Sequence, residues 1–386
     1  MQGLFYKKVL QDPIMQKVMA LSQQEDIRLR EEVMGEIIET AYHLELGGNL
    51  FKKLLCYKIV TDENAFTLSA EREGKAIDAT YKELVLEDIA KLKALFHSDG
   101  IEIQLREKET VFQKVYDAFE EKRSDEEILK TLIEFYHQSG AGMMNGYNAF
   151  KWHTNQKLIG IKNCDTIQLE DLVGCDYQKE MLIRNTENFL QGKMANHVLL
   201  FGDAGTGKSS SVKALLNEYK HQGLRLIELS KSDFRDFNAI LKCIKDRGLK
   251  YILFLDDLSF EEFETEYKYM KALIEGGVEV TPKNVLIYAT SNRRHLIRET
   301  WEERQGEEVH VSDTRQEKLS LSDRFGLTLT FTSPNQKVYL EMVYKLAHQY
   351  NIDIPENSLR EKAIQWELLH SGRSGRVAKQ FIQSLM

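Results

Sequence analysis

Residues 197–210 read His-Val-Leu-Leu-Phe-Gly-Asp-Ala-Gly-Thr-Gly-Lys-Ser-Ser, and this stretch decides the fold. Its first part is a short apolar run, HVLLFG (197–202), which predicts a buried strand. From Gly202 onward it matches G-x-x-x-x-G-K-S/T, the pattern of a loop that wraps around phosphate groups. Glycines let such a loop turn its backbone N–H groups inward, and the helix that follows adds its positive N-terminal end. The stretch therefore predicts a strand, a phosphate-binding loop and a helix in succession.

Each part of this loop has an expected role in binding ATP. The backbone N–H groups are expected to hold the β-phosphate, and Lys208 supplies a mobile positive charge for the β- and γ-phosphates. The hydroxyl of Ser209 is a candidate ligand for Mg²⁺. A glycine-rich turn that merely links a strand to a helix is the alternative, and the acidic strand downstream argues against it. The residues expected to contact the nucleotide are Gly202, Asp203, Ala204, Gly205, Thr206, Gly207, Lys208, Ser209 and Ser210.

A second apolar run ends in two carboxylates about 50 residues further along the chain, at Tyr251-Ile-Leu-Phe-Leu-Asp-Asp257. This pattern is typical of the Walker B strand that follows a phosphate-binding loop. Asp256 is expected to hold the water shell of Mg²⁺, and Asp257 to orient or deprotonate the attacking water. The alternative is a buried strand that simply ends in two solvated aspartates. The loop upstream favours the metal site.

A third run, NVLIYATSN (284–292), ends at Asn292, which is expected to hydrogen-bond the attacking water or the γ-phosphate. A strand-end turn is the alternative role of this asparagine. Together with LRLIELS (224–230), the runs are continuous rather than alternating, which indicates parallel strands covered on both faces. The C-terminal part of the chain is therefore predicted to be a doubly wound α/β domain.

The N-terminal part has a different texture. No proline occurs between Pro13 and Pro282, and apolar residues recur at three- and four-residue steps over 29–44 and 85–96, which predicts amphipathic helices. The segment SGAGMMNGYNAFKWH (139–153), rich in Gly and Asn, marks the change of texture. We expect a mostly helical domain over 1–160, a nucleotide-binding core over 161–333 and a helical lid over 334–386.

Composition excludes several classes of protein. Mean hydropathy is −0.42 and no apolar run approaches the length of a membrane span, so a water-soluble cytoplasmic protein is expected, with no signal peptide. The four cysteines have no paired or zinc-like spacing, which predicts free thiols. The net charge of −8 does not indicate a surface coated for nucleic acid. No H-E-x-x-H pair indicates a metalloprotease.

The order of these motifs resembles that of AAA+ ATPases, over roughly residues 160–386. In SLSDRFG (320–326), Arg324 resembles the arginine finger that one AAA+ subunit presents to its neighbour's γ-phosphate, although an ion pair within the chain is the alternative. In GRSGRVAKQF (372–381), Arg376 resembles the lid arginine that reaches the nucleotide, with Arg373 as the alternative. The segment from Leu169 to Asp176 resembles the one whose backbone flanks adenine.

Several longer stretches are similar to an uncharacterised bacterial AAA+ family known as a domain of unknown function, DUF815. They are LVGCDYQKEMLIRNTENFL (172–190), LFGDAGTGKSSSVKALLNEY (200–219), DDLSFE (256–261), IYATSNRRHLI (287–297) and EKLSLSDRFGL (317–327). That resemblance implies a helical N-terminal region followed by one ATPase module. Asp257 stands where the broader AAA+ pattern more often has Glu, and the shorter carboxylate suggests slow turnover.

The resemblance implies a Mg²⁺-dependent ATPase that works as a homo-oligomer and drives a conformational change in a macromolecular client. The client is expected to be an unidentified protein, and no membrane partner is expected. One alternative is a nucleotide-gated binding switch that hydrolyses ATP slowly. Another is a loader or remodeller that acts on DNA, against which the acidic charge weighs.

Overall fold

The computed structural model describes residues 3–259, apart from 25, 76–77, 99–100 and 154–156, and then 270, 274, 282–292, 324–370 and 372–386. The first part of the SLSDRFG segment, residues 320–323, and Arg293, Arg294 and Glu261 lie outside the described residues. The chain divides into two compact units. The first unit is Met1–Asn148 with Asp246–Leu249, and the second is Ala149–Lys245 with Lys250–Met386.

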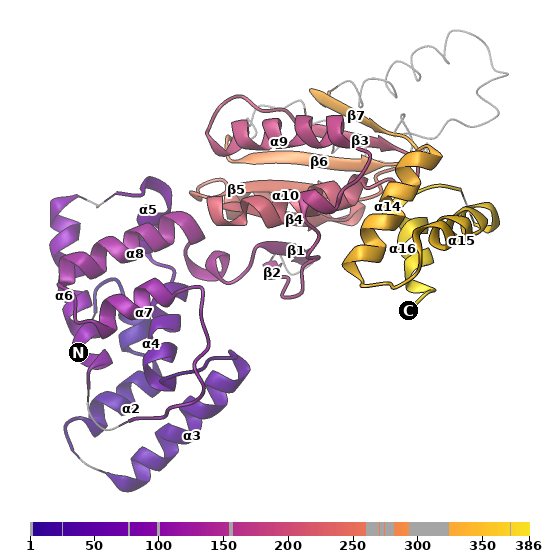
Figure 1. Cartoon of the computed structure of the whole chain (residues 1–386). Coiled ribbons are helices and arrows are strands. Elements are labelled where there is room, and N and C mark those ends of the chain that lie inside the picture. The colour runs from indigo at the N-terminus through magenta and orange to yellow at the C-terminus, as the bar shows by residue number, and fades with distance from the viewer. Residues whose placement is uncertain are drawn as a thin grey trace. The chain divides into compact units, whose positions relative to one another are not determined.

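The first unit is helical, as the sequence predicts (Figure 1). The apolar repeats noted above fall on its third and sixth helices. Asp26, Asn64 and Ser124 start helices by accepting hydrogen bonds from backbone N–H groups of the first turn. Its helices are α1 (Lys7–Leu10), α2 (Pro13–Leu21), α3 (Ile27–His43), α4 (Leu50–Thr61), α5 (Ala65–Glu73), α6 (Ala79–Phe96), α7 (Gln113–Glu120), α8 (Asp125–Ser139) and the 3₁₀ helix η1 (Gly142–Asn145).

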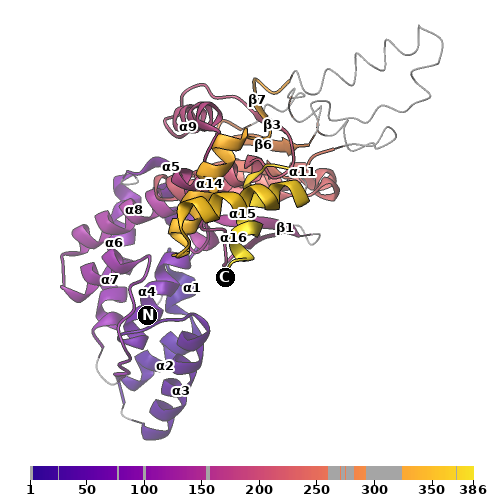
Figure 2. The same ribbon diagram turned by 45° about the vertical axis from the view of Figure 1, so that its right-hand side comes forward.

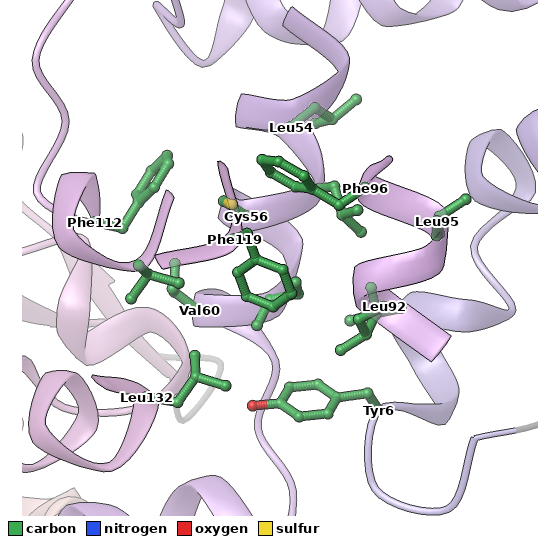
Figure 3. Packing of buried hydrophobic residues seen from close by; sticks show 14 of the residues in the cluster. Tyr6, Leu54, Cys56, Val60, Leu92, Leu95, Phe96, Phe112, Phe119 and Leu132 are labelled. Carbon is green, nitrogen blue, oxygen red and sulfur yellow. The ribbon is translucent and has the colours of Figure 1, made fainter. Parts of the chain in front are cut away.

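The helices of the first unit enclose a core of their own (Figure 3). The rings of Phe96 and Phe119 lie 5.4 Å apart at its centre. The hydroxyl of Tyr6 bonds that of Tyr136 at 3.0 Å, and Tyr136 donates to the carbonyl of Ile59 at 2.8 Å, so both buried phenols are satisfied. Burying one large apolar side chain contributes about 1.5–3 kcal/mol, so this cluster is the main apolar contribution to the stability of the first unit. None of the described helices is long and apolar enough to cross a lipid bilayer.

A four-residue segment from far along the chain completes the first unit. Asp246–Leu249 belongs to it, although the residues on either side belong to the second unit. Arg247 donates from Nε to the fully buried Glu71 at 3.0 Å, from Nη1 to Glu63 at 2.7 Å, and from Nη2 to the carbonyl of Ala141 at 2.6 Å. The guanidinium therefore neutralises a carboxylate that would otherwise be buried as an unpaired charge.

The second unit contains a seven-stranded sheet in the order β2-β1-β4-β5-β6-β3-β7. Neighbouring strands are parallel except for β1 and β2, which are antiparallel. The four apolar runs identified in the sequence correspond to β3, β4, β5 and β6. The strands are β1 (Ala149–His153), β2 (Lys157–Gly160), β3 (Val198–Gly202), β4 (Leu224–Leu229), β5 (Lys250–Leu255), β6 (Val285–Ser291) and β7 (Leu327–Phe331).

The boundary between the units differs from the division made on the sequence, which ended the helical part at residue 160. The structure places 149–160 in the sheet, because β1 pairs in parallel with β4, with Phe150 beside Ile227. Ala149, Phe150 and Trp152 are buried by that pairing. Two short strands after a glycine-rich stretch carry too weak a pattern to be assigned from sequence alone.

Helices cover the sheet and form the lid. On one face, residues of α9 and α10 pack with Val198, Leu200, Ile252 and Phe254, while the alternate residues Leu199 and Leu253 are equally buried. Figure 2 shows α14, α15 and α16 packed together, and they share a separate apolar core. All four cysteines are free thiols. The helices are η2 (Leu169–Asp171), α9 (Asp176–Leu190), α10 (Lys208–Tyr219), η3 (Lys220–Gln222), η4 (Lys231–Asp236), α11 (Phe237–Ile244), α14 (Gln336–Gln349), α15 (Glu356–Leu369) and α16 (Gly375–Gln383).

The fold class predicted from the sequence is therefore confirmed. It is a P-loop α/β fold with a largely parallel sheet, a C-terminal helical lid and a helical N-terminal region.

Candidate nucleotide-binding site

The candidate site lies where three adjacent parallel strands end. Strand β6 lies between β5 and β3 in the sheet, so the residues that follow β5 and β3 flank the end of β6. The carboxyl ends of parallel strands are the usual place for a ligand site in an open α/β sheet. This topology brings together side chains from three separate stretches of sequence.

The phosphate-binding loop has the backbone that its glycines make available. Gly202, Gly205 and Gly207 all have positive φ angles, of 136°, 76° and 99°. A Cβ atom on Gly202 would overlap the carbonyl oxygen of Phe331 in β7, and the N–H of Asp203 donates to that same oxygen at 2.9 Å. Helix α10 begins at Lys208, directly after the loop, so its N-terminal N–H groups point toward the site.

Lys208 lies at the centre of the site. Its ammonium group donates to the carbonyls of Gly202 at 2.8 Å and Asp203 at 2.7 Å, and to Oδ1 of Asn292 at 3.1 Å. The residue is 6% exposed, and burial lowers the pKa of Lys208 because it disfavours the charged form. Asp203, Asp257 and Asp256 oppose that shift.

Asn292 links the lysine to the second acidic residue of the Walker B strand. Its Nδ2 donates to Oδ1 of Asp257 at 2.7 Å while its Oδ1 accepts from Lys208. Asp257 itself has φ of 53°, a left-handed conformation that non-glycine residues rarely adopt. The structure therefore brings Lys208, Asn292 and Asp257 into one hydrogen-bonded chain.

The two expected magnesium ligands also lie together. The hydroxyl of Ser209 donates to Oδ1 of Asp256 at 2.5 Å. Among the described residues, no group of three or more His, Cys, Asp or Glu side chains could hold a metal ion by itself. Mg²⁺ in nucleotide sites needs only one or two protein oxygens besides water and phosphate oxygens. One hydroxyl and one exposed carboxylate at the mouth of the loop fit that requirement.

Asp203 connects the phosphate-binding loop to the start of the lid. Its Oδ2 accepts from the N–H of Ser333 at 2.8 Å and from the hydroxyl of Ser333 at 2.7 Å. These hydrogen bonds hold the pKa of Asp203 below its usual range. Ser333 lies between β7 and α14, so the carboxylate ties the loop to the segment from which the lid extends.

The two candidate lid arginines have different surroundings. Arg373 donates from Nε to Glu367 at 3.0 Å, and this bond raises the pKa of Arg373. Arg376 is exposed, and its N–H lies 3.4 Å from the carbonyl of Gly205 in the loop. The positive charge of Arg376 also lowers the pKa of Lys208. This geometry favours Arg376 as the arginine that faces the nucleotide.

Arg324 lies at the opposite end of the sheet from the loop of its own chain. Strand β7 runs parallel to β3, with Leu327 beside Val198 and Phe331 beside Gly202. Arg324 precedes the strand, and five residues of strand extend about 15 Å. The structure therefore does not bring Arg324 to the site formed by the other residues.

The segment expected to flank adenine lies between the loop and the lid. Leu172 is buried and is the nearest neighbour of a Cβ position on Gly207, at 3.9 Å. Gly174 has φ of 78°, and a Cβ atom there would overlap Val338 of α14. The ammonium group of Lys345 in α14 donates to the carbonyl of Glu170. This placement supports the role that the resemblance implies.

Two residues of the site were not identified from the sequence. Ser333 holds Asp203, and nothing in the sequence marks a serine 130 residues away as its partner. Thr290 in β6 donates to Asp256 at 2.7 Å. It lies two residues before Asn292, near the end of the same apolar run. That position was the signal in the sequence that could have identified Thr290 as a residue of the site.

The profile of one protein family covers most of the chain that forms this site. Residues 145–386, more than half of the chain, match the profile of a family described as a protein of unknown function, DUF815. This match confirms the family resemblance drawn from the sequence.

Two relatives and one solved structure show more limited likeness. The chain is 38% identical over 88 residues to the replication factor C large subunit of Staphylothermus marinus, which is 22% of this chain and 20% of that protein. It is 36% identical over 76 residues to that of Methanococcus vannielii, or 20% and 15% of the two chains. The chain thus spans about one-fifth or less of these relatives. The RuvB Holliday junction branch migration motor of Thermotoga maritima aligns with 56% of this chain and 72% of its own, at 14% identity and a TM-score of 0.36.

Proposed function

The chain belongs to the DUF815 family, and from that membership and the geometry of its site we propose that it is a Mg²⁺-dependent AAA+ ATPase. It couples ATP binding and hydrolysis to a conformational change in a macromolecular partner. The observation that carries the proposal is the hydrogen-bonded chain Lys208–Asn292–Asp257 beside the pair Ser209–Asp256. These are the groups that phosphoryl transfer to water requires, and they meet at the mouth of one loop.

Each group has a role in the proposed reaction. Lys208 stabilises the charge that develops on the phosphate oxygens, and the N–H groups of the loop hold the β-phosphate. Asp257 orients the attacking water and accepts its proton, while Asn292 fixes the carboxylate that does so. Ser209 and Asp256 hold Mg²⁺, which neutralises charge on the β- and γ-phosphates when bound.

Two arginines complete the proposal. Arg376 contacts the nucleotide from the start of α16, because it already lies against Gly205 of the loop. Arg324 acts on the nucleotide of a neighbouring subunit, because it lies at the far end of the sheet from its own loop. The active form is therefore a homo-oligomer.

A slow nucleotide-gated switch is the second candidate, and one observation favours it. Asp257 has a short side chain, and its Oδ1 accepts a hydrogen bond from Asn292. A carboxylate that is held back in this way activates water less readily than a longer, less restrained glutamate. In this candidate, the bound nucleotide rather than its hydrolysis sets the state of the partner.

The local likeness to replication factor C large subunits makes a DNA-associated role a third candidate. The net charge of −8 weighs against it, because non-specific DNA binding depends on neutralising phosphates. Retention on duplex DNA that weakens steeply with salt would support this role. Absence of such binding at low salt would exclude it.

Replacing Lys208 and Asp257 tests the proposal. We expect Lys208→Ala to abolish ATP binding in a folded protein, because Lys208 is the one positively charged side chain of the loop. We expect Asp257→Asn to bind ATP and to lose turnover by about 10²- to 10⁴-fold. Calorimetric titration and a steady-state phosphate-release assay measure the two effects.

Unchanged ATP affinity in folded Lys208→Ala would refute the site. Slow turnover in the wild type, equal to that of Asp257→Asn, would favour the switch.

A further inference from the structure

We propose that Thr290 is a positioning residue of the nucleotide site, whose hydroxyl holds both acidic residues of the Walker B strand in place. The inference rests on the proposed ATPase function. Thr290 is 1% exposed and lies in strand β6, between β5 and β3, with Leu200 of β3 beside it. It does not face the solvent, so it acts through the residues that it holds.

The hydroxyl of Thr290 donates one hydrogen bond and accepts another at the same time. The Oγ1 of Thr290 donates to Oδ1 of Asp256 at 2.7 Å and accepts from the N–H of Asp257 at 2.8 Å. A hydroxyl has one proton to donate and lone pairs to accept, so these two bonds fix its orientation. The carbonyl of Thr290 also accepts from the N–H of Leu258 at 2.7 Å. Three consecutive residues after β5 are therefore attached to a single residue of β6.

The two acidic residues need this support because the strand has already ended. Strand β5 ends at Leu255, so the N–H of Asp257 has left the regular sheet ladder. Asp257 also has a left-handed backbone, which persists only where its surroundings hold it. The carboxylate of Asp256 is exposed, and its Oδ1 accepts from two hydroxyls, that of Ser209 on the phosphate-binding side and that of Thr290 on the buried side. The hydroxyl of Thr290 accepts from the backbone N–H of Asp257 and donates to the carboxylate of Asp256.

Threonine suits this role better than other small residues. Its branched Cβ restricts the first side-chain torsion in a strand, so the backbone of β6 fixes the direction of the hydroxyl. Valine has the same shape without the hydroxyl, and serine has the hydroxyl without the methyl group. The two substitutions therefore separate hydrogen bonding from packing.

The first measurement is ATP binding with Mg²⁺ and with EDTA, by calorimetry on the full chain. We expect Thr290→Val to bind ATP in EDTA as the wild type does, because the phosphate-binding loop is untouched. We expect it to lose about 10- to 100-fold of the affinity that Mg²⁺ adds, the usual effect of removing a group that orients a metal ligand. Thr290→Ser should restore most of that affinity. This readout does not depend on turnover.

The second measurement is steady-state hydrolysis against Mg²⁺ concentration. Thr290→Val should lower kcat and raise the Mg²⁺ concentration needed for half-maximal rate, with Thr290→Ser close to the wild type. The matched control is Thr186→Val. Thr186 is a fully buried threonine of α9, and its hydroxyl forms a hydrogen bond of 2.9 Å with the hydroxyl of Tyr288. Tyr288 lies in β6, as Thr290 does, but away from the nucleotide site. We expect that control to lose stability while keeping kcat and the Mg²⁺ dependence.

Failure of the inference is distinct from failure of the proposed function. A wild-type chain that neither binds nor hydrolyses ATP overturns the proposed function. If the wild type binds and hydrolyses ATP, two results overturn the role of the hydroxyl. One is a Thr290→Val variant that behaves as the wild type does, and the other is a Thr290→Ser variant as impaired as Thr290→Val. If Thr290→Val does not fold, Thr290→Ala replaces it. If neither variant folds, Thr290 supports the fold alone and the inference is wrong.

Discussion

At the scale of single residues, His197 shows how burial sets a charge state beside the central strand of the site. Its Nδ1 accepts a hydrogen bond from the N–H of Ile287 at 3.0 Å, which only an unprotonated nitrogen can do. Burial lowers the pKa of His197 to about 4, well below the ordinary value of 6.5. The imidazole is therefore neutral in the folded protein throughout the physiological range.

This shift predicts a loss of stability in mild acid. Between pH 6.5 and about 4, the unfolded chain binds a proton on His197 that the folded chain excludes, so the free energy of unfolding falls as pH falls. The side chain is partly exposed, and we expect an effect on the order of 1–2 kcal/mol between pH 7 and pH 5. Urea denaturation at the two pH values measures it. His197→Asn keeps an acceptor and does not titrate, so an equal loss in that variant would contradict the assignment.

At the scale of elements, the start of α16 places the two candidate lid arginines, Arg373 and Arg376, in different surroundings. Arg373 is paired at 3.0 Å with Glu367, which is only 5% exposed. Arg376 lies one helical turn further on, against Gly205 of the phosphate-binding loop. Two similar side chains three residues apart thus have different environments, Arg373 just before α16 and Arg376 in its first turn.

Substituting each arginine in turn should give opposite phenotypes. Arg373→Ala leaves a buried carboxylate without its partner, so we expect it to lower the free energy of unfolding with little change in ATP affinity. Arg376→Ala should weaken ATP binding while leaving the melting temperature nearly unchanged. Thermal unfolding and calorimetric titration of both variants make the comparison. The assignment is reversed if Arg373→Ala is the variant that loses affinity.

Local pattern made some of these elements predictable. Strands β3 to β6 are continuous apolar runs, and the residues that end them form the site, because parallel strands carry their carboxyl ends to one edge. The contacts of Thr290 and Ser333 depend on which strands are neighbours in the sheet. No short segment of sequence predicts that strand order. For the same reason β1 and β2 were not predicted. Their assignment depends on the pairing of β1 with β4 and of β2 with β1, rather than on their own composition.

At the scale of the whole molecule, the role proposed for Arg324 at a neighbouring subunit's site would make activity a property of an assembly. An arginine finger supplied from another subunit is worth about 10³- to 10⁵-fold in rate in related reactions. We expect specific activity to rise with protein concentration, and Arg324→Ala to bind ATP normally while losing that rise. Enzyme assays over a concentration series, with sizes measured by light scattering, test both points.

Mixing two inactive variants gives the sharper test of this arrangement. When Asp257→Asn and Arg324→Ala co-assemble, some interfaces join an intact site to an intact finger, so activity should reappear. Each variant alone, at the same total concentration, is the control. Proteins that co-assemble without recovery would contradict the role in a neighbouring site and leave Arg324 a function within its own chain, such as a structural ion pair.

The segment Asp246–Leu249 has a consequence for how the chain is made. Glu71 leaves the ribosome long before Arg247, and at about 5–20 residues per second the intervening residues take on the order of 10–40 s to synthesise. During that interval the helices of the first unit surround a carboxylate that lacks its guanidinium. The nascent unit therefore stays less stable than the finished one until translation has passed the loop before β5. Its completion coincides with the synthesis of β5 and of Asp256 and Asp257, which follow that strand.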